Sequence, residues 1–178
     1  MEIQLSIFLL HIQMNESYLS IGTNIGDKHN NLKACSEQIS KLQIEILNIS
    51  SIYLTDALED ISQPRFYNIV MHIRTVYSLD VFFKKIKNIE FYMGRPVDRK
   101  KNSPRIIDID LLTFENIIIE TESLILPHPR LYRRKFVLEP WYELAPEFIV
   151  PGYNKSVSHL LNDVKDVSKV RKLQSVEL

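Results

Sequence analysis

Two aspartates, Asp108 and Asp110, are the residues whose type and spacing best suit chemistry, and they stand in the string SPRIIDIDLL at 103–112. Side chains on a β-strand alternate between faces, so both carboxylates would point to one side, about 7 Å apart. Their neighbours on that side, Ile106 and Leu112, are apolar. Two carboxylates among them would repel each other and lose hydration unless cations lay between them. Oxygen ligands suit hard cations, and Mg²⁺ is typically held by one or two carboxylates plus substrate phosphates. The alternative is an edge strand with a solvated polar face.

Basic residues gather directly before the acidic pair, at Arg95, Arg99, Lys100, Lys101 and Arg105. This separation of basic from acidic residues suits a polyphosphate chain, because the cations can bind its outer oxygens while metal ions bridge the inner ones. A merely solvated loop is the alternative. The sequence contains no Walker loop and no G-x-G-x-x-G string, so ATP binding would depend on this loop and on His128.

Two further strings offer binding groups. LPHPR at 126–130 displays His128 on a rigid, proline-flanked turn, with Phe136 a little further on. Phe66 and Asn68 are two positions apart and would share one strand face, where an aromatic ring beside an amide can stack on a flat heterocycle and hydrogen-bond its edge. Taken singly, a structural histidine and ordinary core packing are the more common explanations of these strings.

Hydrophobic periodicity predicts the elements that would position these residues. Strands are expected at 18–21, 44–55, 66–75, 105–114 and 117–120. Helices are expected after Asp27 and Ser78, which can act as N-caps, with Gly94 ending the second helix. The order strand, helix, strand, strand, helix, strand predicts an α+β fold: a ferredoxin-like βαββαβ core whose antiparallel sheet has helices on one face, followed by a C-terminal extension. One domain is expected over 15–165, with a loose N-terminal extension over 1–14 and a tail over 166–178.

Composition narrows the class of protein. The chain has 22 basic and 22 acidic residues, so nothing suggests a protein that coats a polyanion or binds a membrane surface. Its single cysteine, Cys35, cannot form an internal disulfide, and this favours a reducing compartment, the cytoplasm. No run approaches the ~20 apolar residues of a membrane span. The first ten residues lack the basic head and the cleavage site of a signal peptide.

Taken together, the strings resemble one family, the 6-hydroxymethyl-7,8-dihydropterin pyrophosphokinases. Five of them occur in that family's order and approximate spacing: YLSIGTNIGD, FYNIV, IEFYMGR, SPRIIDIDLL and LPHPRLYRRKFVLEPWYELAP. The resemblance runs from about residue 18 to residue 164. It implies an enzyme of folate biosynthesis that uses ATP and two Mg²⁺ ions to pyrophosphorylate the pterin alcohol, releasing AMP. It implies small-molecule partners only, with no nucleic acid or membrane, and a monomer or weak homodimer.

The same resemblance implies roles for individual residues. Asp108 and Asp110 match the metal ligands and, with Arg95 and Arg105, would form the catalytic set. The residues that match ATP contacts are Lys101, His128, Arg134, Arg95 and Arg105. Those that match the pterin pocket are Gly22, Thr55, Leu58, Phe66, Asn68 and Phe136. Glu90 matches an acidic position near the site.

Several positions depart from the family's pattern. Val97 stands where many members have arginine, Asn102 where they usually have tryptophan, and Asp56 where proline is common; Ser123 and Ile125 replace polar or basic nucleotide contacts. Because none of these is a metal ligand, we expect weaker substrate affinity or slower closure of a lid over 94–104 rather than loss of chemistry.

Two alternatives remain beside this interpretation. One is a catalytically silent relative that binds pterin or ATP without turnover. The other is a ferredoxin-like sheet that stacks single-stranded nucleic acid on Phe66 and Tyr67. The neutral charge of the chain and its acidic pair disfavour the second, because such a sheet needs basic surroundings.

Overall fold

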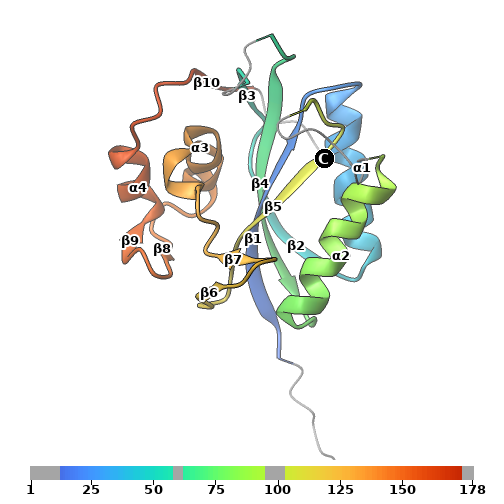
Figure 1. Cartoon of the computed structure of the whole chain (residues 1–178), viewed down its shortest axis with the longest axis vertical. Coiled ribbons are helices and arrows are strands. Elements are labelled where there is room, and N and C mark those ends of the chain that lie inside the picture. Colours follow the sequence, from blue (N-terminus) through green and yellow to red (C-terminus); the bar gives the residue numbers. More distant parts are fainter. Residues whose placement is uncertain (1–12, 58–61, 95–102, 174–178) are drawn as a thin grey trace, which may run out of the picture.

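The computed structural model describes residues 13–57, 62–94 and 103–173, and within them the chain forms an antiparallel sheet with helices on both faces (Figure 1). The sheet runs in the order β10-β3-β4-β1-β5, and β2 pairs with β4 beside that path. Its strands are β1 (Asn15–Thr23), β2 (Glu45–Ile49), β3 (Tyr53–Thr55), β4 (Phe66–Thr75), β5 (Asp108–Phe114) and β10 (Val170–Lys172). Strand β1 pairs with β4 along its whole length, so these two strands form the centre of the sheet.

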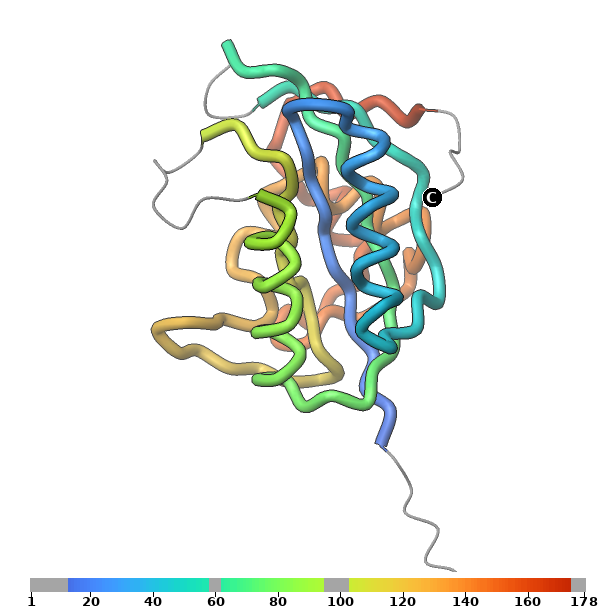
Figure 2. The backbone as a smooth tube through the Cα atoms, turned by 90° about the vertical axis from the view of Figure 1, so that its right-hand side faces the viewer, coloured from blue at the N-terminus to red at the C-terminus, as the bar shows by residue number. Residues whose placement is uncertain are grey.

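The helices form two layers. Helices α1 (Lys28–Lys41) and α2 (Leu79–Tyr92) cover one face of the sheet, where Figure 2 shows them side by side. They complete the predicted βαββαβ core. The opposite face is covered by α3 (Lys135–Leu144) and α4 (Val157–Asp163) (Figure 1). The prediction placed helices on one face only, and the C-terminal extension supplies the second layer.

Short elements connect these layers. They are the hairpin of β6 (Ile119–Glu120) with β7 (Ile125–Leu126), the 3-10 turn Leu131–Arg133, and the hairpin of β8 (Ile149–Val150) with β9 (Lys155–Ser156). The 3-10 turn leads directly into α3. The chain from residue 126 onward therefore crosses from the edge of the sheet to the face that α3 and α4 cover.

Local sequence explains where α1 and α2 begin and end. Asp27 caps α1, since its Oδ1 accepts a hydrogen bond from the N–H of Asn30 at 3.1 Å. Ser78 occupies the N-cap position of α2, as predicted. Its side chain makes no capping hydrogen bond, so it does not act as the cap that was expected. Gly94 follows α2 with a φ of 91°, a left-handed conformation that glycine adopts without steric penalty.

The sheet separates two hydrophobic clusters. The cluster under α1 and α2 contains Ile39, Phe82 and Ile86, all fully buried. The other lies under α3 and α4 and includes Trp141, which is also fully buried. Because both faces are covered, β1 and β4 are buried through most of their length, and these are the strands that carry Gly22 and Asn68.

Several segments differ from the expectation. The expected strand 44–55 is divided at Ser50, whose hydroxyl accepts a hydrogen bond from Val70 N at 2.9 Å while its own N–H donates to Val70 O at 2.9 Å. The expected tail from residue 166 contains β10, which pairs with β3 as an edge strand of the main sheet. The expected strand from Arg105 begins at Asp108.

Two other expectations concern the chain as a whole. Most of the expected loose extension, residues 1–12, lies outside the described residues. In the described part, no helix has the length and apolarity needed to cross a membrane.

Candidate active site

The acidic pair lies at the start of β5, on the edge of the sheet. Both side chains are partly buried, with exposed fractions of 21% for Asp108 and 27% for Asp110. Arg105 Nη1 donates to Asp108 Oδ2 at 2.6 Å, and Arg134 Nη1 donates to Asp110 Oδ2 at 3.1 Å. The Nε2 atom of His128 lies 3.8 Å from Asp110 Oδ2. The structure thus brings five predicted site residues together at one strand end.

Charge and burial compete at this strand end. Burial alone would raise the pKa of Asp110, but the charge that His128 carries when protonated, together with those of Arg134 and Lys87, outweighs burial and holds that pKa below its usual range. Burial lowers the pKa of His128, assisted by nearby cations including Arg134 and opposed by Asp110. Asp110 is therefore ionised at neutral pH while His128 favours the neutral imidazole, which can donate or accept a hydrogen bond.

An ion pair on α2, of which the carboxylate is buried, holds the backbone between the two aspartates. Lys87 Nζ lies 3.1 Å from Glu90 Oε2 and donates to the carbonyl oxygen of Ile109 at 2.7 Å. Glu90 Oε1 accepts a hydrogen bond from Ile109 N, also at 2.7 Å. Both edge-facing backbone groups of Ile109 are therefore satisfied by side chains. The prediction placed Glu90 near the site, and the structure agrees; Lys87 was missed, although its spacing of three from Glu90 marks a shared helix face.

The predicted pterin residues on the sheet lie on three adjacent strands. Asn68 on β4 stands opposite Gly22 on β1, and Phe66 stands opposite Thr55 on β3. Asn68 Nδ2 donates to Thr55 Oγ1 at 2.8 Å. A β-carbon added to Gly22 would lie 2.9 Å from Asn68 Oδ1, a distance that real contacts avoid. Gly22 is also opposite Asp108 on β5, so one row across the sheet joins the amide, the glycine and the first carboxylate.

The two aromatic residues predicted to bind the pterin, Phe66 and Phe136, each pack against an arginine that is paired with one of the two aspartates. The guanidinium carbon of Arg105 lies 5.5 Å from the ring centroid of Phe66, and that of Arg134 lies 5.5 Å from the ring centroid of Phe136. Phe136 belongs to α3, so the second face of the sheet supplies this ring. Each of the two carboxylates is therefore paired with an arginine, and each arginine packs on an aromatic ring.

Asn24 is a further site residue that the sequence interpretation missed. Its Oδ1 accepts a hydrogen bond from Arg105 N at 2.7 Å, and its N–H donates to Arg105 O at 3.1 Å. Asn24 is almost fully buried, and its place in the glycine-flanked turn was the available signal. Within the described part of the chain, Nε of Arg105 is buried without a hydrogen-bond partner, so the fixed arginine retains a donor for a ligand.

Several predicted positions lie outside the described residues. They are Leu58, Arg95, Val97, Lys101 and Asn102, together with most of the expected lid. Of the other departures, Asp56 forms an exposed ion pair with Arg65 at 2.8 Å, whereas Ser123 and Ile125 belong to the β6–β7 hairpin. Among the described residues, no group of three or more Asp, Glu, His or Cys side chains has the arrangement of a metal site, so a cation at Asp108 and Asp110 would need ligands other than these described side chains.

Comparison with known proteins gives a consistent picture. The family model of 7,8-dihydro-6-hydroxymethylpterin-pyrophosphokinase (HPPK) matches residues 18–146. The chain is 36% identical over 138 residues to the 2-amino-4-hydroxy-6-hydroxymethyldihydropteridine pyrophosphokinase of Aquifex aeolicus, covering 78% of this chain and 85% of that one. The enzyme of the same name from Bacillus subtilis is 34% identical over 134 residues, covering 75% and 80%.

Some relatives are much longer. The chain is 38% identical over 137 residues to the folic acid synthesis protein FOL1 of Dictyostelium discoideum, covering 77% of this chain but only 20% of that protein. It thus spans about a fifth of such relatives. Among solved structures, an HPPK-DHPS in complex with substrates superposes with a TM-score of 0.66 at 15% identity, covering 84% of this chain and 43% of that chain. The Plasmodium falciparum HPPK-DHPS with pteroate gives 0.65 at 17%, covering 84% and 44%. At such identities the structures establish the fold alone.

Proposed function

The chain belongs to the 7,8-dihydro-6-hydroxymethylpterin-pyrophosphokinase family, and on this premise we propose that it transfers pyrophosphate from ATP to 6-hydroxymethyl-7,8-dihydropterin in folate biosynthesis. The observation that carries the proposal is the row across the sheet. Asn68, Gly22 and Asp108 stand opposite one another on β4, β1 and β5. A ligand whose ring meets the amide therefore extends its side group toward the carboxylates.

The pterin would bind over Gly22. Because this residue has no side chain, the Asn68 amide can lie close to the backbone of β1, and Asn68 and Thr55 offer polar groups to the ring's edge. Phe66 and Phe136 supply aromatic faces, and we include Leu58 in this pocket from its position in the family pattern. The hydroxymethyl group would then point toward Asp108.

The triphosphate would bind on the basic side of the acidic pair. Arg105 and Arg134 are already fixed by ion pairs and by aromatic contacts, so little side-chain entropy is lost when they bind phosphate oxygens. His128, held next to Asp110, can contribute a hydrogen bond. Arg95 and Lys101 are proposed as further phosphate contacts from their family positions.

The two carboxylates fit Mg²⁺, because hard cations take oxygen ligands. For Asp110, the nearby positive charges also hold the pKa below its usual range and so favour the ionised form that binds a cation. Asp108 and Asp110 would hold two such ions, with the remaining ligands from phosphate and water. When bound, Mg²⁺ supplies neutralisation of the triphosphate and stabilisation of its transferring oxygens.

The reaction balances without a redox partner. A bond forms between the hydroxymethyl oxygen and the β-phosphorus of ATP, the bond from that phosphorus to the oxygen of the α-phosphate breaks, and AMP leaves with that electron pair. The hydroxyl proton is released. The chain contributes by orienting the two substrates, while Arg105 and Arg134 stabilise charge that develops on the phosphate oxygens.

The cellular setting is part of the proposal. A chain with no net charge and one buried cysteine fits a cytoplasmic enzyme that acts as a monomer or weak homodimer and has no nucleic-acid or membrane partner.

The experiment is an AMP-release assay with 6-hydroxymethyl-7,8-dihydropterin and MgATP, paired with calorimetric titration of each ligand. We expect AMP to form only when the pterin alcohol is present. Binding of both ligands without AMP would identify a silent relative and would overturn the catalytic part of the proposal. Binding of neither would overturn the whole.

A further inference from the structure

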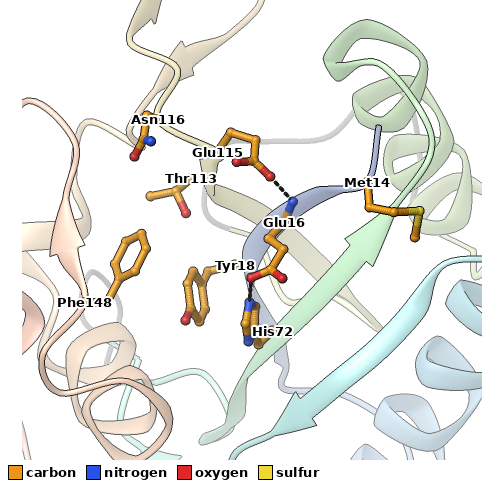
Figure 3. Close-up of a pocket in the computed structure, with 8 residues that line it drawn as sticks. All are labelled: Met14, Glu16, Tyr18, His72, Thr113, Glu115, Asn116 and Phe148. Atoms are coloured by element: carbon orange, nitrogen blue, oxygen red, sulfur yellow. Dashed lines mark hydrogen bonds and ion pairs between the residues drawn. The ribbon is translucent and has the colours of Figure 1, made fainter. Parts of the chain in front are cut away.

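A cavity lies beside the first half of β1 (Figure 3), whereas the acidic pair stands opposite Ser20 and Gly22 in the second half of that strand. Its volume is about 320 Å³, at the lower end of the range for small-molecule pockets. Glu16, on its wall, is six positions before Gly22 on β1, which puts the two roughly 20 Å apart along a strand that rises about 3.4 Å per residue. This cavity, here called the β1–β5 pocket, is separate from the proposed active site.

Aromatic rings form one wall of the β1–β5 pocket. The rings of Tyr18 and Phe148 have centroids 4.9 Å apart and are tilted by 59°, and the Tyr18 ring stacks on His72 with centroids 4.5 Å apart. Figure 3 shows Tyr18 and Phe148 facing the same space as Thr113. Burial, and next the charge of Glu16, raise the pKa of Tyr18 to about 12, so this wall stays uncharged. These packed rings are held in place before any ligand arrives.

Two carboxylates lie on the other side of the pocket, and their negative charges are balanced by neighbouring cations to different extents. Glu16 is paired through both oxygens, with His72 Nε2 at 2.9 Å and with Arg74 Nη2 at 2.9 Å. Glu115 uses Oε1 to accept a hydrogen bond from the backbone N–H of Glu16. Within the described residues, no cationic side chain lies within ion-pair distance of Glu115, and its Oε2 has no partner. One carboxylate charge therefore remains uncompensated beside the aromatic wall.

The lining excludes several ligand classes. It contains no lysine or arginine, so an anion would meet Glu16 and Glu115 without a matching cation. The described residues offer no cluster suited to a metal ion. A purely apolar ligand would cover the second oxygen of the Glu115 carboxylate without offering it a hydrogen bond. An ammonium group, in contrast, is attracted both to a carboxylate and to aromatic faces.

We propose that the β1–β5 pocket binds a small organic ammonium ion, with its charged head at Glu115 and its apolar body against Tyr18 and Phe148. The volume matches about ten water molecules at ~30 Å³ each, which suits a compact monoamine rather than a polymer. The proposal is independent of the proposed function, because none of the residues that line this pocket is among the residues predicted to bind the metal, ATP or the pterin.

The test uses the full chain and three probes of similar size: benzylammonium, neutral benzyl alcohol and anionic benzoate. Binding is followed by two-dimensional amide NMR. We expect benzylammonium to bind about tenfold more tightly than benzyl alcohol, with shifts at Thr113, Asn116 and His72, and we expect benzoate not to bind. Equal affinity for the amine and the alcohol, shifts located elsewhere, or no binding of the amine would overturn the proposal.

Variants of the pocket residues distinguish the loss of a charge or an aromatic ring from a loss of folding. In Glu115→Gln the side-chain carbonyl can still accept the Glu16 N–H, so the fold should persist while the preference for the amine over the alcohol disappears. Glu122→Gln, on the exposed turn between β6 and β7, is the matched control and should behave as wild type. Phe148→Leu keeps an apolar residue but removes an aromatic face, and should weaken amine binding several-fold. Unchanged amine binding in both Glu115→Gln and Phe148→Leu would contradict the assignment.

Discussion

Glu90 Oε1 accepts a hydrogen bond from the backbone N–H of Ile109 at 2.7 Å. The same carboxylate is paired with Lys87, which donates to the carbonyl of Ile109. Ile109 stands between Asp108 and Asp110, so an ion pair on α2 fixes the strand segment from which both carboxylates project. The position of the acidic pair thus depends on helix packing as well as on the strand.

Glu90→Ala should lower both stability and turnover. The Glu90 side chain is only 5% exposed, and its loss removes the acceptor of the Ile109 N–H and the negative charge beside Lys87, which costs about 1–3 kcal/mol. We expect kcat to fall more than the affinity for either substrate, because the aspartates lose their alignment. Urea unfolding and steady-state AMP release measure the two effects. Glu37→Ala, at an exposed site on α1, should change neither, and a Glu90→Ala variant with wild-type kcat would show that the ion pair does not position the site.

Gly22→Ala should weaken pterin binding selectively. The new β-carbon would lie 2.9 Å from Asn68 Oδ1 and 3.7 Å from Phe66 Cδ1, so the amide must move away from the hydrogen bond with Thr55. A loss of about 1–2 kcal/mol corresponds to roughly a 5- to 30-fold weaker pterin complex. Calorimetric titration with the nucleotide serves as the internal control. Equal losses for both ligands would indicate a general disturbance of the sheet instead.

Glu143 should contribute stability that depends on pH. It accepts hydrogen bonds from Ser51 and Tyr53 at 2.9 and 2.8 Å, and Lys172 Nζ lies 3.2 Å from it. Burial opposes ionisation, but these donors outweigh burial and lower the pKa of Glu143 below its usual range. Because the folded pKa lies below the unfolded one, the contribution is complete at neutral pH and is lost as pH falls through the unfolded and then the folded pKa.

We therefore expect Glu143→Gln to be less stable than wild type by about 1–3 kcal/mol at pH 7. The difference should shrink steadily as the pH is lowered below about 5. Denaturant unfolding at several pH values measures it. Glu147→Gln, at an exposed position, should run parallel to wild type. A stability difference for Glu143→Gln that did not vary with pH would show that the carboxylate charge is not the stabilising feature.

Alternation along strands was enough to predict which candidate residues share a strand face. It placed Asp108 with Asp110, and Phe66 with Asn68, on common faces, and the structure has both pairs on the predicted strands. The order of helices and strands was also predictable, since α1 and α2 show clear apolar stripes and begin after recognisable N-cap residues.

Long-range packing was not predictable from local patterns. The strand Val170–Lys172 has no apolar periodicity, and it forms only because β3 offers an unpaired edge. Helix α3 contains Pro140, which disfavours a helix interior, and no helix was predicted there. The Lys87 contact with Ile109 O joins residues 22 positions apart, and the sequence shows that Lys87 shares a face with Glu90 but not which backbone they meet.

The measurement that tests the central claim most directly is AMP release by Asp108→Ala and Asp110→Ala at saturating magnesium, with Asp163→Ala, at an exposed ion pair on α4, as the control. We predict that both site variants lose more than nine-tenths of wild-type turnover while melting cooperatively, and that the control keeps its activity. Retention of more than about a tenth of the activity in either variant, a barrier change below roughly 1.4 kcal/mol, would contradict the assignment of pyrophosphate transfer to this pair.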